Sequence, residues 1–128
     1  VVDRGPATDQ RTDYAKWGTR LAQEVASGHL DVGIALCGSG IGISIAANKV
    51  KGIRAACVSE IYSAEMSRRH NNANILCFGS RVVGPDVALA ICEAFLKASF
   101  EGGRHADRVG QLRQLDAGDT SFLHEDAE

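Results

Sequence analysis

Residues 36–44 read LCGSGIGIS and place one cysteine, Cys37, at the start of a glycine-rich turn. A cysteine close to the N-terminus of a helix has a lowered pKa, which suits a base or a nucleophile. Gly38, Gly40 and Gly42 let the backbone approach a ligand, and free amides at the start of the next helix bind anions. That anion would be a phosphate or a transient oxyanion such as an enediolate. A buried structural cysteine beside a tight turn explains the same residues equally well.

The glycine spacing argues against a dinucleotide site. The dinucleotide fingerprint is G-x-G-x-x-G with an acidic residue after the next strand, whereas this turn reads G-x-G-x-G. A nucleotide-binding module is therefore disfavoured.

Further polar residues could act on a substrate, and each has a plainer structural explanation. His70, in RRHNNAN, could transfer protons near neutral pH, although a histidine that ends a helix is the simpler interpretation. Arg81 follows an apolar run, and Arg104 and Arg108 stand one helical turn apart, as a phosphate site would require. A solvated charged tail explains the last two as well. Asp13 is an acid–base candidate and an ordinary helix N-cap.

The elements that must position these residues follow a repeated pattern of strand, loop and helix. Unbroken apolar runs predict buried strands, and apolar spacing with caps predicts helices. The strands are expected at 32–36, 53–58 and 75–79, and the helices at 14–28, 42–50, 60–70 and 85–100. This order predicts an α/β fold, a Rossmann-like three-layer sandwich with a mainly parallel sheet whose ligands bind beyond the carboxyl ends of the strands.

Several local details are predicted as well. The first helix should bury Ala15, Leu21, Ala22 and Val25, and Gly28 should end it. Ser59 should cap the third helix, and Pro85 should stand in the first turn of the fourth.

Bulk properties narrow the functional classes. The 128 residues suggest one domain, with a polar C-terminal tail from about 102 to 128. A net charge of −2 disfavours nucleic acid, and no apolar run approaches the ~18 residues that cross a membrane. Cys57 and Cys77 lie in apolar runs and Cys92 on a helical pattern, so buried free thiols and a cytoplasmic location are expected. The spacing of cysteine and histidine matches no zinc site.

Taken together, long ordered motifs resemble the type B ribose-5-phosphate isomerases, in the wider family with galactose-6-phosphate and allose-6-phosphate isomerases. The matching stretches are RTD followed by YAKW, CGSGIGISIAANKVKGIRA, SRRHNNANIL, FGSRVVG and EGGRH, over residues 1 to about 110. The resemblance implies a metal-independent, cofactor-free aldose–ketose isomerase. It implies a homodimer or a dimer of dimers whose active sites use residues from two subunits.

The resemblance also implies a role for each matching residue. Cys37 would be the base that moves the proton from C2 to C1, and His70 would help open the sugar ring. The enediolate would lie against Gly38 and the backbone amides of Ser39, Gly40, Ile41 and Gly42, with the Ser44 hydroxyl beside it. Asp13, Tyr14 and Asn71 would contact the sugar, and Arg81, Arg104 and Arg108 the phosphate.

One departure and two alternatives belong with this interpretation. Family members begin with a strand and helix that carry an Asp-His pair, and we expect this first strand and helix to be missing ahead of VVDRG. The substrate is expected to be ribose 5-phosphate, and the alternative is a six-carbon sugar phosphate such as allose 6-phosphate or galactose 6-phosphate. A non-catalytic phosphosugar-binding subunit is a third class, which the retained Cys37 argues against.

Overall fold

A small parallel sheet forms the middle layer of the protein. The computed structural model describes residues 1–125. Its elements in chain order are α1 (Tyr14–Ala26), β1 (Gly33–Cys37), α2 (Ile41–Asn48), β2 (Ala55–Cys57), α3 (Ile61–Arg69), β3 (Ile75–Gly79), α4 (Pro85–Lys97), α5 (Arg104–Asp116) and the 3-10 helix η1 (Ser121–His124). The strands lie in the order β1-β3-β2, and both pairs are parallel.

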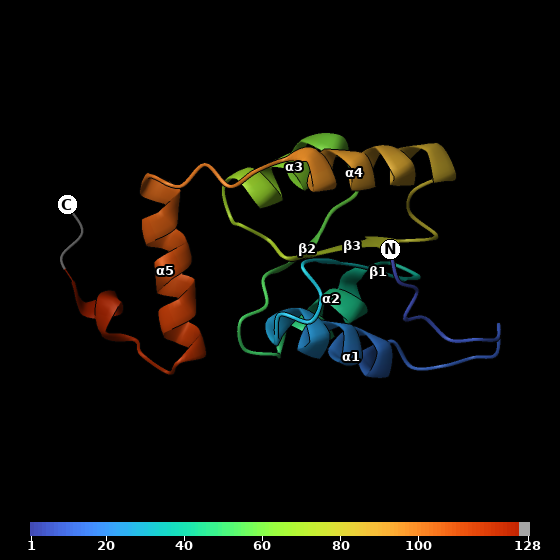
Figure 1. The fold of residues 1–128 in the computed structure, drawn as a ribbon, viewed down its shortest axis with the longest axis horizontal. Helices are drawn as coiled ribbons and strands as arrows, with labels where there is room; N and C mark the ends of the chain where they lie inside the picture. Colours follow the sequence, from blue (N-terminus) through green and yellow to red (C-terminus); the bar gives the residue numbers. More distant parts are fainter. Residues whose placement is uncertain (126–128) are drawn as a thin grey trace.

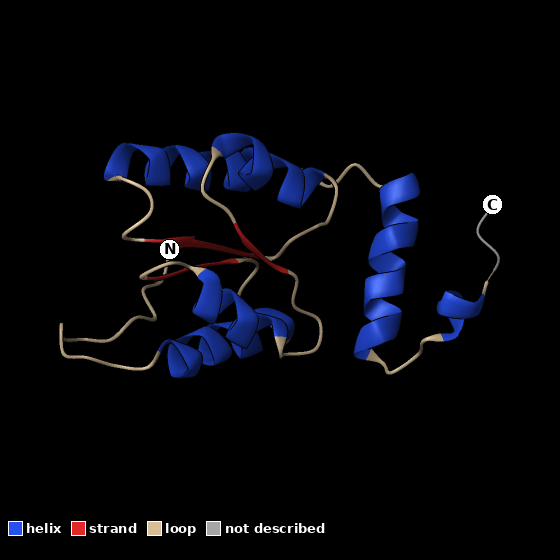
Figure 2. Ribbon diagram, turned by 180° about the vertical axis from the view of Figure 1, so that it is seen from behind, coloured by secondary structure: helices blue, strands red, loops and turns tan. Residues whose placement is uncertain are grey.

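Helices cover both faces of this sheet, as the alternating pattern predicts. Figure 1 shows α1 and α2 on one face and α3 and α4 on the other. Figure 2 gives the same three layers from behind, with the strands in red between the two helical layers. The predicted Rossmann-like sandwich is therefore confirmed.

The apolar core has two halves, because successive side chains of β3 point to opposite faces. Ile75 and Cys77 pack with the core beneath α1 and α2, whereas Leu76 and Phe78 pack with the core beneath α3 and α4. All five residues of β3 are buried.

The two outer strands are less buried than their apolar sequences predict. Leu36 in β1 is 48% exposed, and Cys57 in β2 is also exposed. The prediction of a buried Cys57 was wrong, while Cys77 on the central strand is buried. Position in the sheet makes the difference, since β3 has a neighbour on each side and β1 and β2 each pair on one side within residues 1–125.

Most helix boundaries agree with the predicted ranges. Pro85 stands in the first turn of α4, and Gly28 follows the end of α1 with a φ of +83°. Two details were wrong: Glu60, not Ser59, caps α3 through its carboxylate and the Ser63 amide, and Ala15 is exposed. The buried residues of α1 are Gly18, Ala22 and Val25.

The polar C-terminal stretch contains a longer helix than its sequence suggests. α5 has 13 residues, with His105 and Val109 buried on one side. Figure 1 shows α5 standing beyond one end of the sheet and running across the level of both helical layers. The end of this predicted polar tail contains η1, and its final residues 126–128 lie outside the described residues.

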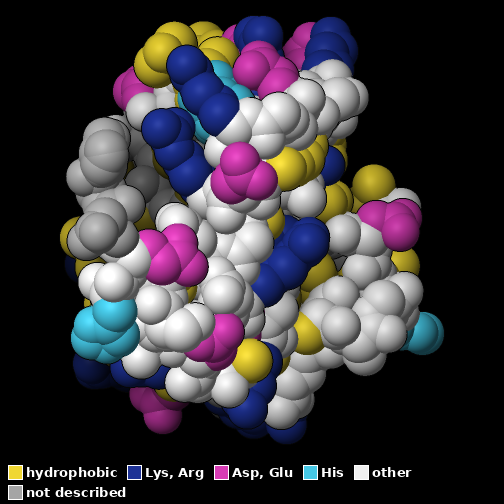
Figure 3. All heavy atoms as spheres, turned by 90° about the vertical axis from the view of Figure 1, so that its left-hand side faces the viewer, with side chains coloured by type: hydrophobic (Ala, Val, Ile, Leu, Met, Phe, Trp, Pro, Cys, Tyr) yellow, Lys and Arg dark blue, Asp and Glu magenta, His cyan; other side chains and the backbone are white. Residues whose placement is uncertain are grey.

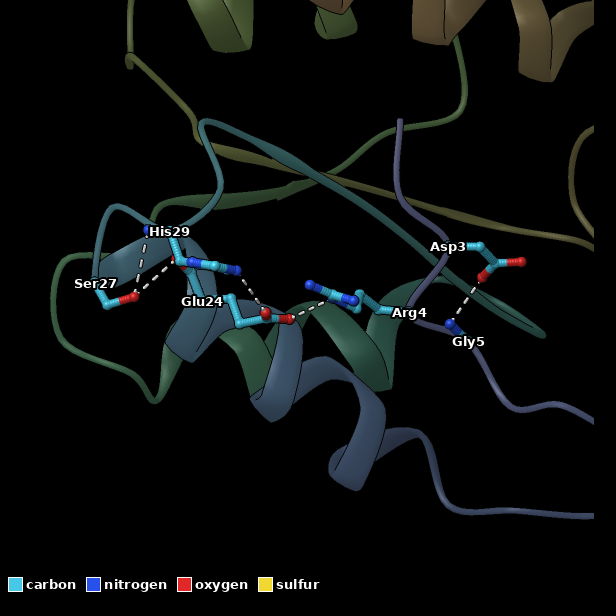
Figure 4. Close-up of polar contacts among 6 residues, drawn as sticks. All are labelled: Asp3, Arg4, Gly5, Glu24, Ser27 and His29. Carbon is cyan, nitrogen blue, oxygen red and sulfur yellow. Dashed lines mark hydrogen bonds and ion pairs between the residues drawn. The ribbon is translucent and has the colours of Figure 1, made fainter.

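The N-terminal segment lies against α1. Arg4 Nε donates to Glu24 Oε2 at 3.0 Å, and the other oxygen of Glu24 is 3.8 Å from His29 Nε2 (Figure 4). Exposed ion pairs of this kind contribute at most about 1 kcal/mol each. This segment therefore has little influence on the elements that carry the candidate site.

No helix among residues 1–125 combines the length and the apolar content needed to cross a membrane.

Candidate active site

The predicted site residues fall into two groups at opposite ends of the sheet. Cys37 ends β1 and pairs with Gly79, the last residue of β3. His70 ends α3, five positions ahead of the first residue of β3, Ile75. β3 separates the two ends by about 13 Å, at about 3.3 Å per residue. Within the described part of the chain, these groups do not form one site.

The first group, called the Cys37 cluster, consists of Tyr14, Cys37, Gly38, Ser39, Ile41, Gly42 and Arg81. These residues, with Ile45 and Val82, line a cavity of about 720 Å³ at the carboxyl end of the sheet. The sequence places the glycine turn here because β1 ends at Cys37 and α2 begins at Ile41. This location agrees with the general position of ligands in parallel α/β sheets.

The thiol of Cys37 is held by the backbone that follows it. Gly40 N donates to Cys37 Sγ at 3.2 Å. Partial burial acts to raise the pKa of this thiol, but four backbone amides between residues 39 and 43 outweigh it, so the pKa lies below its ordinary value. A thiolate is therefore accessible, next to amides that can also bind a second anion.

The turn depends on glycine at two positions. Gly40 has a φ of +82°, and a Cβ there would lie 2.6 Å from the carbonyl carbon of Phe78. A Cβ on Gly42 would lie 2.6 Å from the Tyr14 ring. Because of these close approaches, the amides of the turn sit directly over the end of β3 and beside Tyr14.

The loop after β3 closes the other side of the Cys37 cluster. Ser80 N donates to Cys37 O at 2.9 Å, and Arg81 N donates to Gly38 O at 3.1 Å. The exposed Arg81 guanidinium thus stands at the rim of the cavity and offers a positive charge to an anion there. Arg81 therefore lies with the glycine turn and apart from Arg104 and Arg108, with which it was grouped as a phosphate contact.

Asp13 and Ser44 belong to this end but do not line the cavity. Asp13 precedes Tyr14 as the N-cap of α1, yet its side chain makes no capping hydrogen bond. Ser44 is buried, and its hydroxyl donates to Ile41 O at 2.7 Å. Ser44 therefore supports the first turn of α2, and Asp13 remains exposed near the rim.

The second group, called the His70 cluster, consists of His70, Asn71, Glu101, Arg104, His105 and Arg108. The His70 and His105 rings are stacked, with centroids 4.1 Å apart and planes at 8°. Burial is the main cause that lowers the pKa of His105, and the charges of His70, Arg104 and Arg108 lower it further, against Glu101. Figure 3 views this side of the molecule and shows basic and acidic side chains mixed over it.

Glu101 lies beside both histidines of the His70 cluster. Its Oε2 pairs with Arg69 Nη2, and its Oε1 lies 3.7 Å from His70 Nε2 and 3.8 Å from His105 Nε2. Glu101 was not predicted as a site residue from the sequence. The signal available in the sequence was the Glu-x-x-x-His spacing of residues 101 and 105.

His70, Glu101 and His105 are also the one group of three possible metal ligands in residues 1–125. Their arrangement does not suit a divalent cation. The lone pairs of the two stacked rings lie in two nearly parallel planes, whereas the lone pairs of two imidazoles that bind one ion must converge on it. Three arginines, Arg69, Arg104 and Arg108, add positive charge around the group. The same set of charges favours an anion such as phosphate.

Comparisons with known proteins identify a family. A family model described as Ribose/Galactose Isomerase matches residues 1–112. Ribose-5-phosphate isomerase B of Escherichia coli (strain K12) is 51% identical over 116 residues, which are 91% of this chain and 78% of that protein.

Solved structures give the same result. The ribose-5-phosphate isomerase B of Clostridium thermocellum matches with a TM-score of 0.89 and 52% identity, over 91% of this chain and 79% of that one. The Mycoplasma genitalium ribose-5-phosphate isomerase B with bound ribulose-5-phosphate matches with a TM-score of 0.86 and 41% identity, over 91% and 78%.

Proposed function

Because the chain belongs to the ribose/galactose isomerase family, we propose that it interconverts ribose 5-phosphate and ribulose 5-phosphate within a single domain. The reaction passes through an enediolate, and Cys37 is the base. One observation carries this assignment: the Cys37 thiol has a lowered pKa at the head of a row of backbone amides. A non-catalytic subunit that only binds a phosphosugar would not require a thiol of lowered pKa at this position.

Proton transfer takes place at the Cys37 cluster. The thiolate removes the proton from C2 of the open-chain aldose, and the electrons move to the carbonyl oxygen O1. The amides of Ser39 to Gly42 hold this oxyanion, which lowers the barrier because they are already oriented. The hydroxyl proton passes from O2 to O1, and the Cys37 thiol returns its proton at C1. Asp13 and Tyr14 face the sugar from the rim.

Ring opening and phosphate binding fall to the His70 cluster of a second subunit. Ribose 5-phosphate is mostly a furanose, whose opening needs a proton removed from O1 and one added to the ring oxygen. His70 is suited to this exchange near neutral pH. Arg104 and Arg108, both exposed at the start of α5, bind the phosphate, and Asn71 contacts the sugar.

The separation of the two clusters in one chain supports a dimer, or a dimer of dimers, with shared active sites. Exposed apolar side chains also surround the Cys37 cavity: Ile41 is 58% exposed, Ile45 55% and Val82 59%. A second copy of the chain would cover them and bring its own His70 cluster to this cavity.

Subunit mixing tests the shared site directly. Cys37→Ala and His70→Ala are each nearly inactive on ribose 5-phosphate, and the two proteins are unfolded together and refolded. About half of the refolded dimers then contain one subunit of each variant. In such a dimer one site combines the intact Cys37 with the intact His70, and the other site lacks both. Activity therefore returns to about a quarter of wild type. Activity that does not rise above the separate variants refutes a site built from two subunits.

We also propose that the reaction needs no metal and takes place in the cytoplasm. Amides and arginines supply the charge stabilisation that a metal would otherwise provide, and all four cysteines are free thiols, as suits a reducing compartment. Turnover that survives dialysis against a strong chelator supports the first statement. Loss of turnover that added Mg²⁺ or Zn²⁺ restores refutes it.

The central test follows deuterium. Ribulose 5-phosphate is incubated with the enzyme in D₂O, and NMR follows deuterium entering C1 and the appearance of ribose 5-phosphate. Exchange with aldose formation supports the proposal. If neither occurs, the same experiment with allose 6-phosphate and galactose 6-phosphate identifies a six-carbon substrate, and the absence of exchange with all three sugars refutes an isomerase.

A further inference from the structure

The turn between α3 and β3 carries two proposed functional residues without support from regular structure. It covers residues 70–74, with His70 and Asn71 at its start. Asn72 has a φ of +47° and is the one non-glycine residue with a positive φ in the chain from 1 to 125. Such a conformation persists only where neighbouring groups impose it.

Arg54 supplies part of that constraint. This residue stands directly before β2, and its guanidinium reaches across to the turn. Nε donates to the carbonyl oxygens of Asn71 and Asn72, both at 3.1 Å, and Nη2 donates to Asn72 O at 2.9 Å. A planar guanidinium holds two successive carbonyls at a fixed angle, which a lysine ammonium on a flexible stem cannot do.

Backbone contacts of the same segment hold the far end of the turn. Arg54 N donates to Asn74 Oδ1 at 2.8 Å, and Asn74 N donates to Arg54 O at 3.0 Å. Asn74 Nδ2 also donates to Gly52 O at 2.9 Å. The turn is thus fixed to residues 52–54 at both ends, and the side chain of Arg54 controls the end next to His70.

Arg54 also faces α5, which carries the arginines of the His70 cluster. It lines a second cavity of about 410 Å³ together with Asn71 and, from α5, Leu112, Leu115 and Asp116. Asp116 Oδ2 accepts a hydrogen bond from Gly52 N at 2.8 Å. The segment before β2 therefore contacts the turn that carries His70 and the C-terminal half of α5.

We propose that Arg54 is a positioning residue for ring opening, because it fixes the backbone that directs His70 and Asn71 toward the substrate. This inference rests on the proposed function and on the role of His70 in it. The hydrogen bonds of Arg54 run to Asn71, Asn72 and Asn74 and not to the Cys37 cluster, so its replacement should leave proton transfer between C1 and C2 unaffected.

Ribulose 5-phosphate separates the two steps. Its O5 carries the phosphate, so it cannot close a five- or six-membered ring and stays open-chain. Deuterium exchange at its C1 reports proton transfer alone, whereas conversion of ribose 5-phosphate requires ring opening as well.

The test compares Arg54→Lys with Arg68→Lys. Arg68 is the matched control because its Nη1 donates to a carbonyl of the same turn, that of Ala73, and its guanidinium lies over the Phe95 ring. Arg68 does not hold the carbonyls of Asn71 and Asn72. Saturating ribulose 5-phosphate is used for exchange, and the thermal unfolding temperature is measured for both variants.

Arg54→Lys should lower kcat/KM for ribose 5-phosphate by about ten- to a hundredfold, the effect of a misplacement of about 1 Å. Its C1 exchange should stay within about twofold of wild type, and Arg68→Lys should change neither. Equal kinetics of the two variants, or an equal loss of exchange and conversion in Arg54→Lys, overturns the inference. Wild-type enzyme that shows no exchange refutes the proposed function as well.

Discussion

The two clusters differ in what they are made of. The Cys37 cluster acts through backbone amides, positioned by glycines within residues 37–42. The His70 cluster offers polar and charged side chains from the turn after α3, from Glu101 and from α5. Backbone amides are positioned by the fold, so a substitution that moves the turn displaces several of them together. Side chains, in contrast, can be replaced one at a time. We therefore expect substitutions in the Cys37 cluster to abolish exchange and turnover together, and substitutions in the His70 cluster to affect individual steps of the reaction.

The largest effect is expected for Cys37→Ala. Removal of the base should lower both C1 exchange and net turnover by about 10³-fold, within the range of general base catalysis. Cys57→Ala is the matched control at a neighbouring thiol. Burial is the main cause that raises the pKa of Cys57, with the nearby Cys37 adding to it and a hydrogen bond with Ser44 opposing it, and its Sγ lies 3.9 Å from Ser39 O. NMR exchange in D₂O measures both variants. Normal exchange in Cys37→Ala would falsify the assignment of the base.

A methyl group at Gly40 should damage the same cluster through the backbone. The left-handed φ and the contact with Phe78 force the turn to move, with a cost of about 1–3 kcal/mol in stability. Displaced amides should lower exchange by about 10²-fold. Gly110→Ala in α5, where nothing lies within 4 Å of a Cβ, should be neutral or stabilise by about 0.5–1 kcal/mol. Denaturant unfolding and exchange rates check both, and equal behaviour of the two variants would contradict the requirement for glycine at residue 40.

His70→Ala should separate the two steps of the reaction. Conversion of ribose 5-phosphate should fall about 10²-fold, because ring opening loses its acid–base group. Exchange at C1 of ribulose 5-phosphate should persist, since the thiol and its amides are intact. His29→Ala, at an exposed histidine beside Glu24, should leave both rates unchanged. If exchange in His70→Ala falls as far as conversion, the assignment of ring opening to the His70 cluster and proton transfer to the Cys37 cluster is wrong.

The smallest effect concerns stability against pH. The pKa of His105 is lowered in the folded protein, so the unfolded chain binds more protons between that pKa and about 6.5. The contribution of neutral His105 to the free energy of unfolding is therefore fully present above about pH 6.5, and it decreases as the pH falls through this window. His105→Gln should weaken the dependence of the unfolding temperature between about pH 7.5 and 5.5. An unchanged dependence would show that His105 is not the group responsible.

Several predictions from sequence failed for reasons that lie in tertiary contacts. Cys57 was expected to be buried like Cys77, but only the central strand is covered on both sides. Arg54 was not predicted, because an arginine in GIRA has no local signature of function. Glu101 was not predicted either, because its spacing from His105 was its one local signal. Their hydrogen-bond and ion-pair partners lie up to 32 and 20 positions away, from Glu101 to Arg69 and from Arg54 to Asn74.

The sequence by itself determined the alternation of strands and helices, the glycine turn with its cysteine, and the family. These features are local, since apolar periodicity, caps and a motif of consecutive residues are legible along the chain. Only the tertiary structure decided that Cys37 and His70 stand at opposite ends of the sheet, and that His70 stacks on His105 beside Glu101. Parallel strands place the residues that precede and follow them at opposite edges, and the path of α5 across one of those edges depends on packing between distant segments.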